Sequence, residues 1–249
     1  MPGLALSAQN LVKRYGDAVA LDLDRLEVVP GEVVGLVGNN GAGKTTLLRL
    51  AMDLIAPTAG AVALDGVRVG GRDQGWKRRV GAYLDAGFLI DYLRPQEYFR
   101  FVGGAYGVGA AEVEARVAPL AGFLGEALSG GRLIRDLSLG NAGKVGIVAA
   151  LLPEPDLVIL DEPFANLDPG ARIALEGLIR QQGARGATVL VSSHDLDHVV
   201  DVCGRVLVLD RGRVARDTPS TPGTLAELRD FFSRGGTAEL KERPALTAT

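Results

Sequence analysis

The sequence has one cysteine, Cys203, in 249 residues. A single thiol cannot form a disulfide within the chain, and this cysteine usage is typical of a reducing compartment. Val202, Val206 and Val208 surround Cys203 along the chain. We therefore expect its thiol to pack in the core and not to act as a nucleophile.

Long apolar runs and an excess of positive charge are also missing. No apolar run approaches the roughly 18 residues needed to cross a bilayer, and the N-terminus lacks the charged, apolar and cleavage regions of a signal peptide. The net charge of −3 gives no basic character that would indicate binding to nucleic acid or acidic lipid. The sequence thus predicts a soluble, cytoplasmic protein whose membrane role, if it has one, depends on a partner.

Aromatic residues make up only 5% of the chain, whereas 47% of its residues are hydrophobic and 34 are glycine. This composition suits α/β layers with many tight turns, and the length is ample for one sizeable core. Short apolar runs alternate with longer amphipathic stretches, a pattern typical of a parallel sheet with crossover helices. We expect strands, the first three deeply buried, at Val33–Val37, Leu157–Leu160, Val189–Val191 and Val206–Leu209.

The rest of the chain predicts smaller parts around this sheet. The stretch around Ala59–Val69 is typical of a hairpin that turns at Asp65-Gly66. From Asp91 to Leu152 the pattern is helical, and we place a helical subdomain at about residues 88–152. A short helix is expected near Leu225–Phe232, so that the folded domain spans residues 4–235. Residues 236–249 are expected to be disordered.

The segment GNNGAGKT, residues 38–45, fits the phosphate-loop pattern G-x-x-x-x-G-K-[ST]. A predicted strand precedes it, and apolar residues follow at helical spacing at positions 47, 50, 51 and 54. Its backbone N–H groups would curl around phosphate oxygens at a helix N-terminus, while Lys44 reaches the β and γ phosphates and Thr45 offers its hydroxyl to Mg²⁺. A chance glycine-rich turn is the alternative, which the order of strand, motif and helix disfavours. The nucleotide-binding residues predicted here are Gly38, Asn39, Asn40, Gly41, Ala42, Gly43, Lys44, Thr45 and Thr46.

Two carboxylates, Asp161 and Glu162, stand at the end of the apolar run that begins at Leu157. Mg²⁺ prefers oxygen ligands and often takes a carboxylate, directly or through water, so Asp161 suits that role. Glu162 could then polarise a water for attack on the γ phosphate. The alternative is an acidic cap at the end of a strand.

A third apolar run, Val189–Val191, leads to Ser192-Ser193-His194-Asp195. The polar groups of all three motifs therefore follow the carboxyl ends of strands, where open α/β sheets bind ligands. This position favours a catalytic role for His194. The other histidine, His198, lies in an expected helix, Leu196–Val202, and we interpret it as an ordinary structural residue.

These motifs, in this order, make the chain similar to the ATP-binding cassette (ABC) ATPases, specifically to the nucleotide-binding subunit of a transporter. The resemblance covers roughly Leu4 to Phe232. It implies a P-loop NTPase core of the RecA-like α/β type with an N-terminal antiparallel β flank and an inserted helical subdomain. It also implies that Tyr15, otherwise a surface turn residue, stacks on adenine, that Asp168 belongs to the D-loop, and that His194 contacts the γ phosphate.

The sequence departs from the family pattern in the Q-loop. Where the family usually has glutamine, this chain has Asp85, after the stretch VGAYL. A carboxylate could still reach Mg²⁺ or water, though with a shorter and charged arm. The coupling role of this position stays open.

The second departure concerns the signature, which reads LSGGQ in most of the family. Two stretches compete for it, LSGGR with Ser129 and LSLGN with Ser138. In the family the signature serine lies about 23 residues before Asp161, the spacing of Ser138 (161 − 138 = 23), whereas Ser129 lies nine residues too far away (161 − 129 = 32). We therefore assign the signature to Ser138 and Gly140, followed by a helix from Gly143 to Leu152, and interpret LSGGR as a loop between helices.

The resemblance implies an ATP-hydrolysing subunit of an ABC transporter that pairs head to tail with a second ATPase chain around two ATP and Mg²⁺. Each ATP would contact Lys44 and Thr45 of one chain and Ser138 and Gly140 of the other. The second chain would form a homodimer or a pseudo-symmetric heterodimer. A separate transmembrane permease would hold the subunit at the cytoplasmic face of the membrane. The chain resembles export-type ATPases more than import-type ones.

Two alternatives to transport stay open at this point. One is a soluble, non-transport ABC ATPase, although the paired cassettes and inserted modules of such proteins do not occur in this sequence. The other is an ATP-binding regulatory module without turnover, which Asp85 and LSLGN would favour and which Glu162 and His194 disfavour.

The stretch from Phe88 to Phe101 is unusually aromatic for this chain. These side chains would belong either to the core of the helical subdomain or to a groove that receives a cytoplasmic helix of the membrane partner. The sequence leaves both accounts open.

Overall fold

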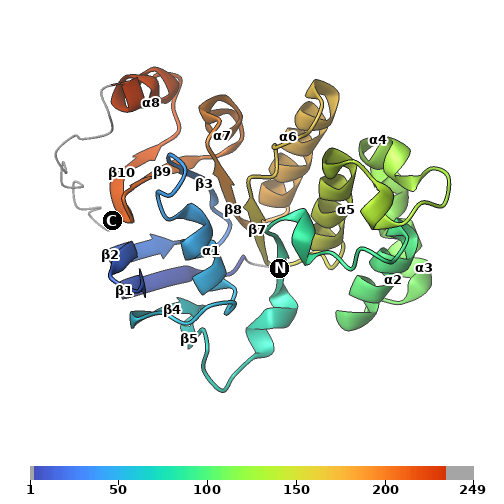
Figure 1. Ribbon diagram of the computed structural model, residues 1–249, viewed down its shortest axis with the longest axis horizontal. Helices are drawn as coiled ribbons and strands as arrows, with labels where there is room; N and C mark the ends of the chain where they lie inside the picture. The colour runs from blue at the N-terminus through green and yellow to red at the C-terminus, as the bar shows by residue number, and fades with distance from the viewer. Residues whose placement is uncertain (1–2, 234–249) are drawn as a thin grey trace.

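The computed structural model describes residues 3–233, which form two sheets and a group of helices. Figure 1 shows the smaller sheet on the left, the larger sheet in the middle, and helices α2 to α5 on the right. The expected disorder of residues 236–249 lies outside the described residues. None of the helices in the described part of the chain combines the length and apolarity needed to cross a membrane.

The smaller sheet is antiparallel, with the strand order β2-β1-β4-β5. Its strands are β1 (Leu6–Tyr15), β2 (Ala18–Val28), β4 (Ala59–Leu64) and β5 (Val67–Arg68). The hairpin predicted around Ala59–Val69 is confirmed. Its turn residues Asp65 and Gly66 have φ values of 47° and 78°, the left-handed backbone that a two-residue hairpin turn requires.

The larger sheet has six strands in the order β10-β9-β3-β8-β7-β6, and all neighbours are parallel except β10 at the edge. Its strands are β3 (Val33–Val37), β6 (Val80–Tyr83), β7 (Leu157–Asp161), β8 (Thr188–Ser193), β9 (Arg205–Asp210) and β10 (Arg213–Pro219). Because β3, β8 and β7 are parallel neighbours, their carboxyl ends meet at the same edge of the sheet. The polar motifs that follow these strands are thereby brought together.

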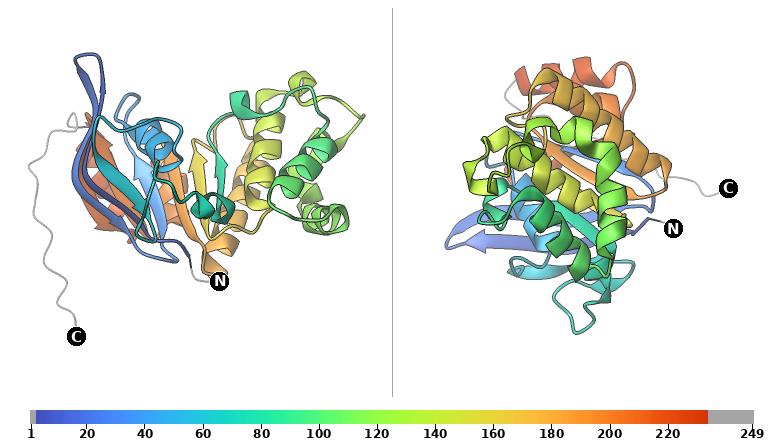
Figure 2. Two further views of the ribbon diagram at one scale, coloured as in Figure 1. Left: turned by 90° about the horizontal axis from the view of Figure 1, so that it is seen from below. Right: turned by 90° about the vertical axis from the view of Figure 1, so that its right-hand side faces the viewer.

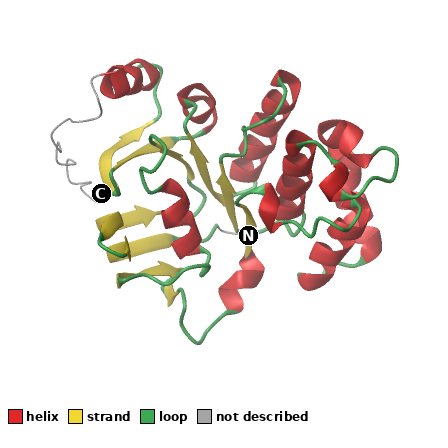
Figure 3. Ribbon diagram, in the orientation of Figure 1, coloured by secondary structure: helices red, strands yellow, loops and turns green. Residues whose placement is uncertain are grey.

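Each face of the larger sheet is covered by its own apolar layer. Helix α1 (Lys44–Ala51) packs between the two sheets through Leu47, Leu48 and Leu50. The opposite face is covered by α5 (Leu139–Leu151), α6 (Pro169–Ala184) and α7 (Leu196–Val202), which contribute to a second core with Val158, Val189 and Val206. Burial on both faces explains why the central strands are continuous apolar runs (Figures 2 and 3).

Residues 84–156, all of them described, contain helices and turns but no strand. The elements are η2 (Ala86–Phe88), α2 (Pro95–Ala105), α3 (Ala110–Val117), η3 (Ala118–Leu120), α4 (Ala121–Leu124), η4 (Gly125–Leu128), η5 (Ile134–Asp136) and α5. The helical character expected here is confirmed. The boundaries proposed for the subdomain, 88–152, and for the whole domain, 4–235, stay predictions.

The predicted α/β class, the antiparallel flank and the four central strands are confirmed. So are the helix near the end of the described chain, α8 (Thr224–Ser233), and α7. The helix after the phosphate loop is shorter than predicted, because Asp53 takes a left-handed φ of 60° and leaves Leu54 47% exposed beyond the helix. Strands β6 and β10 and the short helix η1 (Gly75–Arg79) were not predicted, since β6 has four residues and the edge strand β10 is largely polar.

Cys203 is 5% exposed at the end of α7, which confirms its expected place in the core. Burial raises the pKa of its thiol to about 12. A thiol with so high a pKa is almost fully protonated at neutral pH and is a poor nucleophile.

Candidate functional site

The predicted phosphate loop runs from the end of β3 to the start of α1. Two glycines in it could not be replaced without strain. Gly43 has a φ of 106°, and a Cβ on Gly38 would lie 2.4 Å from the carbonyl oxygen of Leu209. Lys44 is 6% exposed, and its Nζ donates to the carbonyl oxygen of Gly38 at 2.7 Å. The loop thus folds tightly over its own lysine.

The remaining loop residues differ in accessibility. Asn39, Asn40 and Gly41 are exposed, whereas Ala42 and Gly43 are buried against the sheet. Thr45 and Thr46 follow Lys44 in the first turn of α1, and both are half-buried. The loop therefore presents its tip and the first turn of the helix to a ligand.

Strand β7 ends in Asp161, which is 5% exposed and lies opposite Ser192 of β8 in the sheet register. The Ser192 hydroxyl donates to the Asp161 carboxylate. The same Oγ accepts from the backbone N–H of Glu162 at 2.9 Å. Ser192 therefore fixes both carboxylate residues. No role was predicted for it, although its place directly before Ser193-His194 at a strand end was the available signal.

Glu162 is the centre of the site. Its φ of 47° turns the chain sharply after β7 and brings its carboxylate toward both neighbouring motifs. Oε1 lies 3.3 Å from Lys44 Nζ, and Oε2 accepts from the backbone N–H of His194 at 3.2 Å and from its ring Nδ1 at 2.8 Å. Glu162 thus contacts both Lys44 and His194, which were predicted separately from two other strand ends.

The donors available for Mg²⁺ at this edge are the Thr45 hydroxyl and the Asp161 carboxylate. Among the described residues there is no group of three His, Cys, Asp or Glu side chains that could hold a metal alone. Mg²⁺ bound with a nucleotide needs no such group, because phosphates and water supply most of its ligands. One hydroxyl and one buried carboxylate beside a phosphate loop are chemically suited to it.

Asp85, the third residue predicted to bind the metal, follows β6 and caps η2. Its Oδ1 accepts from the backbone N–H of Gly87 at 2.5 Å. It lines a cavity of about 280 Å³ with Asp161, Glu162 and the exposed Leu139. Asp85 therefore faces the site, with one carboxylate oxygen engaged in its own loop.

Tyr15 lies at the end of β1 and is 52% exposed. The ammonium of Lys13 lies 5.0 Å from the centre of its ring. An exposed aromatic ring is free to stack on a base, which is what the family resemblance implies for it.

The two candidate signature serines lie in different structures. Ser138 is the N-cap of α5, and its Oγ accepts from the backbone N–H of Asn141 at 3.3 Å. Helix α5 leads directly to β7, as the spacing argument required. Ser129 follows η4 in a turn in which Gly130 and Gly131 have φ values of 73° and 62°. The helix predicted from Gly143 is longer than expected and begins at Leu139.

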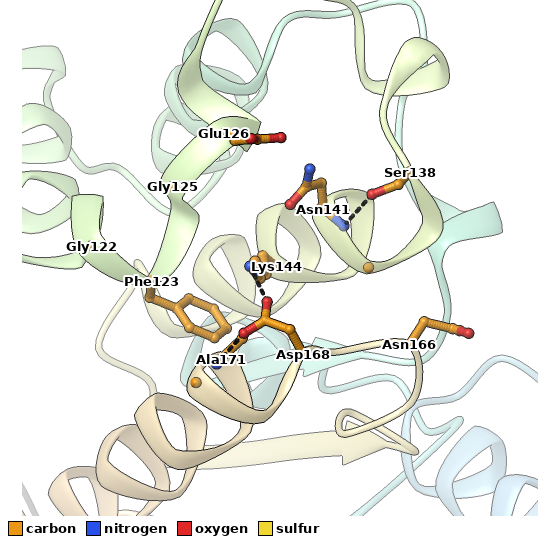
Figure 4. Close-up of a pocket in the computed structure, with 12 residues that line it drawn as sticks. Gly122, Phe123, Gly125, Glu126, Ser138, Asn141, Lys144, Asn166, Asp168 and Ala171 are labelled. Atoms are coloured by element: carbon orange, nitrogen blue, oxygen red, sulfur yellow. Dashed lines mark hydrogen bonds and ion pairs between the residues drawn. The ribbon is translucent and has the colours of Figure 1, made fainter.

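Ser138 and Gly140 line a pocket of about 600 Å³ between the helical part and the start of α6 (Figure 4). A Cβ on Gly140 would lie 2.2 Å from the carbonyl oxygen of Asn166, so only glycine fits there. Lys144 Nζ lies 3.2 Å from Asp168 Oδ2 across this pocket. The Ala171 backbone N–H and then the Lys144 ammonium lower the pKa of Asp168.

The chain is similar to known proteins of one family. A family model described as "ABC transporter" matches residues 21–165. The chain is 34% identical over 221 residues to "Nod factor export ATP-binding protein I" of Paraburkholderia xenovorans (strain LB400), which covers 88% of this chain and 73% of that protein. A solved structure described as "Structure of ATP binding subunit of ABC transporter" has 32% identity and a TM-score of 0.77, over 94% of this chain and 95% of that one. The dimeric structure of a bacterial ABC transporter cassette has 25% identity and a TM-score of 0.78, over 87% and 99%.

Proposed function

We propose a function on the premise that this chain belongs to the ABC transporter family and is one of its ATP-hydrolysing, ATP-binding subunits. Two such chains would close head to tail around two ATP and drive export through a separate membrane subunit. The observation that carries the proposal is the contact of Glu162 with both Lys44 and His194 at one sheet edge. The alternatives without transport that the sequence left open are disfavoured, because the matches are to transporter subunits.

Binding of ATP would begin at the phosphate loop. The backbone N–H groups at the start of α1 and the Lys44 ammonium would hold the phosphates, and the exposed ring of Tyr15 would stack on adenine. Mg²⁺, held by Thr45 and Asp161 with Asp85 near them, would offset phosphate charge when it is bound. Since Lys44 is buried, its attraction to the phosphates would be little screened by water.

Hydrolysis would depend on Glu162 and His194. Glu162 would accept a proton from the attacking water, while His194, already bonded to that carboxylate, would orient it and contact the γ phosphate. Ser192 would keep Glu162 in place through its backbone N–H. These roles follow from the distances between the residues and from the family resemblance.

The pocket at Ser138 would serve the nucleotide of the second chain. It lies at the N-terminus of α5, a part of the fold separate from the phosphate loop, and its helix dipole favours an anion. A head-to-tail pair would bring this N-terminus to the γ phosphate held by the other chain's Lys44. Asp168 and Asn166, at the rim of the same pocket, would lie at the interface.

A membrane partner would sit against the aromatic part of the helical region. A cavity of about 200 Å³ there is lined by Phe88, Leu89, Tyr98, Val102 and Tyr106. Phe88 is 53% exposed and Phe99 1%, so this stretch supplies both core and accessible surface. A side chain from a cytoplasmic helix of the permease would fit this cavity, which would place the chain at the cytoplasmic face of the membrane.

The direction of transport rests on the relatives, several of which are described as Nod factor export proteins. The experiment that tests the proposal is purification of the full chain from its native membranes, with identification of the membrane protein that accompanies it. Reconstitution of that complex should give ATP-dependent export of a cargo. A complex that imports its cargo, or a purified chain that no membrane protein accompanies, would contradict it.

A further inference from the structure

His198 lies between the two loops that carry Glu162 and His194. It lies on α7, four residues after His194 in the sequence. Its ring stacks on Phe164, two residues after Glu162, with ring centres 4.7 Å apart and planes 16° from parallel. One side chain thus contacts the loop after β7 from a helix that follows β8.

The two ring nitrogens of His198 both reach α6. Nδ1 lies 2.8 Å from Glu176 Oε1, and Nε2 lies 3.5 Å from Arg172 Nη1. The carboxylate can only accept and the guanidinium can only donate, so the contact with Glu176 fits a proton on Nδ1.

Arg172 continues the connection into the D-loop, residues 165–168. Its Nε donates to the carbonyl oxygen of Leu167 at 3.1 Å. A path of bonded groups therefore runs from α7 through His198 and Arg172 to the residue before Asp168. This role differs from the ordinary structural one that the sequence predicts for His198.

The surroundings of this cluster are polar but sheltered. The side chains of His198 and Glu176 are 19% and 14% exposed. Asp195 Oδ2 lies 3.6 Å from Nε2, and Arg180 Nη2 lies 3.5 Å from Glu176 Oε2. Partial burial makes each hydrogen bond in the cluster matter more than it would at an exposed site.

We propose that His198 is a positioning residue for ATP hydrolysis. By holding Arg172 and Glu176 of α6 against α7, it fixes the D-loop and the Glu162 loop relative to His194. The 2.8 Å contact between Glu162 and His194 joins two strand ends and is sensitive to any shift between them. The inference rests on the proposed function, in which these two residues act on the γ phosphate. It predicts an effect on turnover and little on ATP binding by the single chain.

Two substitutions at this position separate the contribution of the hydrogen bonds from that of the aromatic ring. In His198→Gln the carboxamide carries a donor and an acceptor on one carbon, just as the two imidazole nitrogens are attached to one carbon. The bonds to Glu176 and Arg172 of α6 can therefore both form. His198→Phe keeps an aromatic ring against Phe164 but loses both bonds. We expect His198→Phe to lower kcat about tenfold, with ATP affinity within about twofold of the wild type, and His198→Gln to stay near the wild type.

The measurements are steady-state ATPase rates of the full chain, counted per nucleotide-binding site, and ATP affinities by equilibrium titration. A wild-type kcat for His198→Phe would overturn the inference. So would an equal loss in His198→Gln, or a loss that disappears when rates are counted per binding site.

Arg172→Met gives a second route if His198→Phe does not fold. It keeps the apolar stem and removes the donors to Leu167 and His198, and we expect the same fall in kcat. The double variant should be no slower than the slower single variant, because both break one path. Additive losses, or a wild-type rate for Arg172→Met, would contradict the inference. Glu162→Gln serves as the separate control, since normal turnover in it would overturn the proposed function itself.

Discussion

Lys44 and Glu162 form an ion pair, with Nζ of the lysine 3.3 Å from Oε1 of the glutamate. The cation proposed to hold the phosphates and the carboxylate proposed as the base therefore neutralise each other when no nucleotide separates them. Phosphate oxygens bound at the loop would replace Glu162 as the partner of Lys44 and leave Glu162 free to bind a water. We expect nucleotide binding to prepare the base for this reason.

Replacement of the base tests this relationship most directly. Glu162→Gln should bind ATP about as well as the wild type and lose at least about a hundredfold in turnover, because an amide cannot take the proton from water. The variant should also accumulate an ATP-bound dimer, seen by size-exclusion chromatography with light scattering. Normal turnover would remove Glu162 from the proposed role, and a monomer with ATP bound would count against the closed pair.

Much of the candidate site could be proposed from the sequence, because its motifs depend on short, local patterns. The phosphate loop combines fixed glycine spacing with a preceding apolar strand, and spacing alone favours Ser138 over Ser129 as the signature serine. Both patterns hold in the folded structure. The spacing, for example, holds because a helix of set length must connect Ser138 to β7.

The contacts of Ser192 and His198 could not be predicted in this way. Ser192 meets Asp161 only because β8 pairs with β7 in one particular register. His198 meets Phe164, Arg172 and Glu176 only because α7 packs beside α6. Both depend on contacts between segments far apart in the sequence. Strand β6 was missed for a related reason, because four residues carry too little pattern without their neighbour β7.

Removal of the Ser192 hydroxyl should weaken both the fold and the site. Ser192→Ala leaves the buried Asp161 carboxylate without this donor and the Glu162 N–H without its side-chain acceptor. We expect a loss of about 1–3 kcal/mol in the free energy of unfolding, measured by urea denaturation, and a lower ATPase rate. Ser193→Ala is the matched control, because in the described part of the chain that neighbouring buried hydroxyl accepts from the backbone N–H of Asp195 and not from Glu162. An equal effect on the ATPase rate in both variants would contradict a specific role for Ser192.

Cys203 should be inert while the protein is folded. Its pKa, raised by burial from 9.0 to about 12, leaves almost no thiolate at pH 8, and the side chain is inaccessible. Iodoacetamide at pH 8 should label it only in urea. Since the unfolded thiol ionises near its ordinary pKa and the folded one does not, this group's contribution to stability should fall as the pH rises from about 9 toward 12. Rapid labelling of the folded chain would show that this thiol is accessible after all.

The two signature candidates can be separated by one pair of substitutions. Ser138→Arg should block turnover, because a bulky cation would fill the N-cap of α5 where the second chain's γ phosphate is proposed to lie. ATP binding by the single chain should survive, since Ser138 would act on the other chain's nucleotide. Ser129→Arg, in the turn after η4, should change the free energy of unfolding by less than about 0.5 kcal/mol and leave the ATPase rate near the wild type. ATPase rates, nucleotide affinities and circular dichroism of both variants provide the comparison. If Ser129→Arg stops turnover while Ser138→Arg spares it, LSGGR is the signature and the spacing argument is wrong.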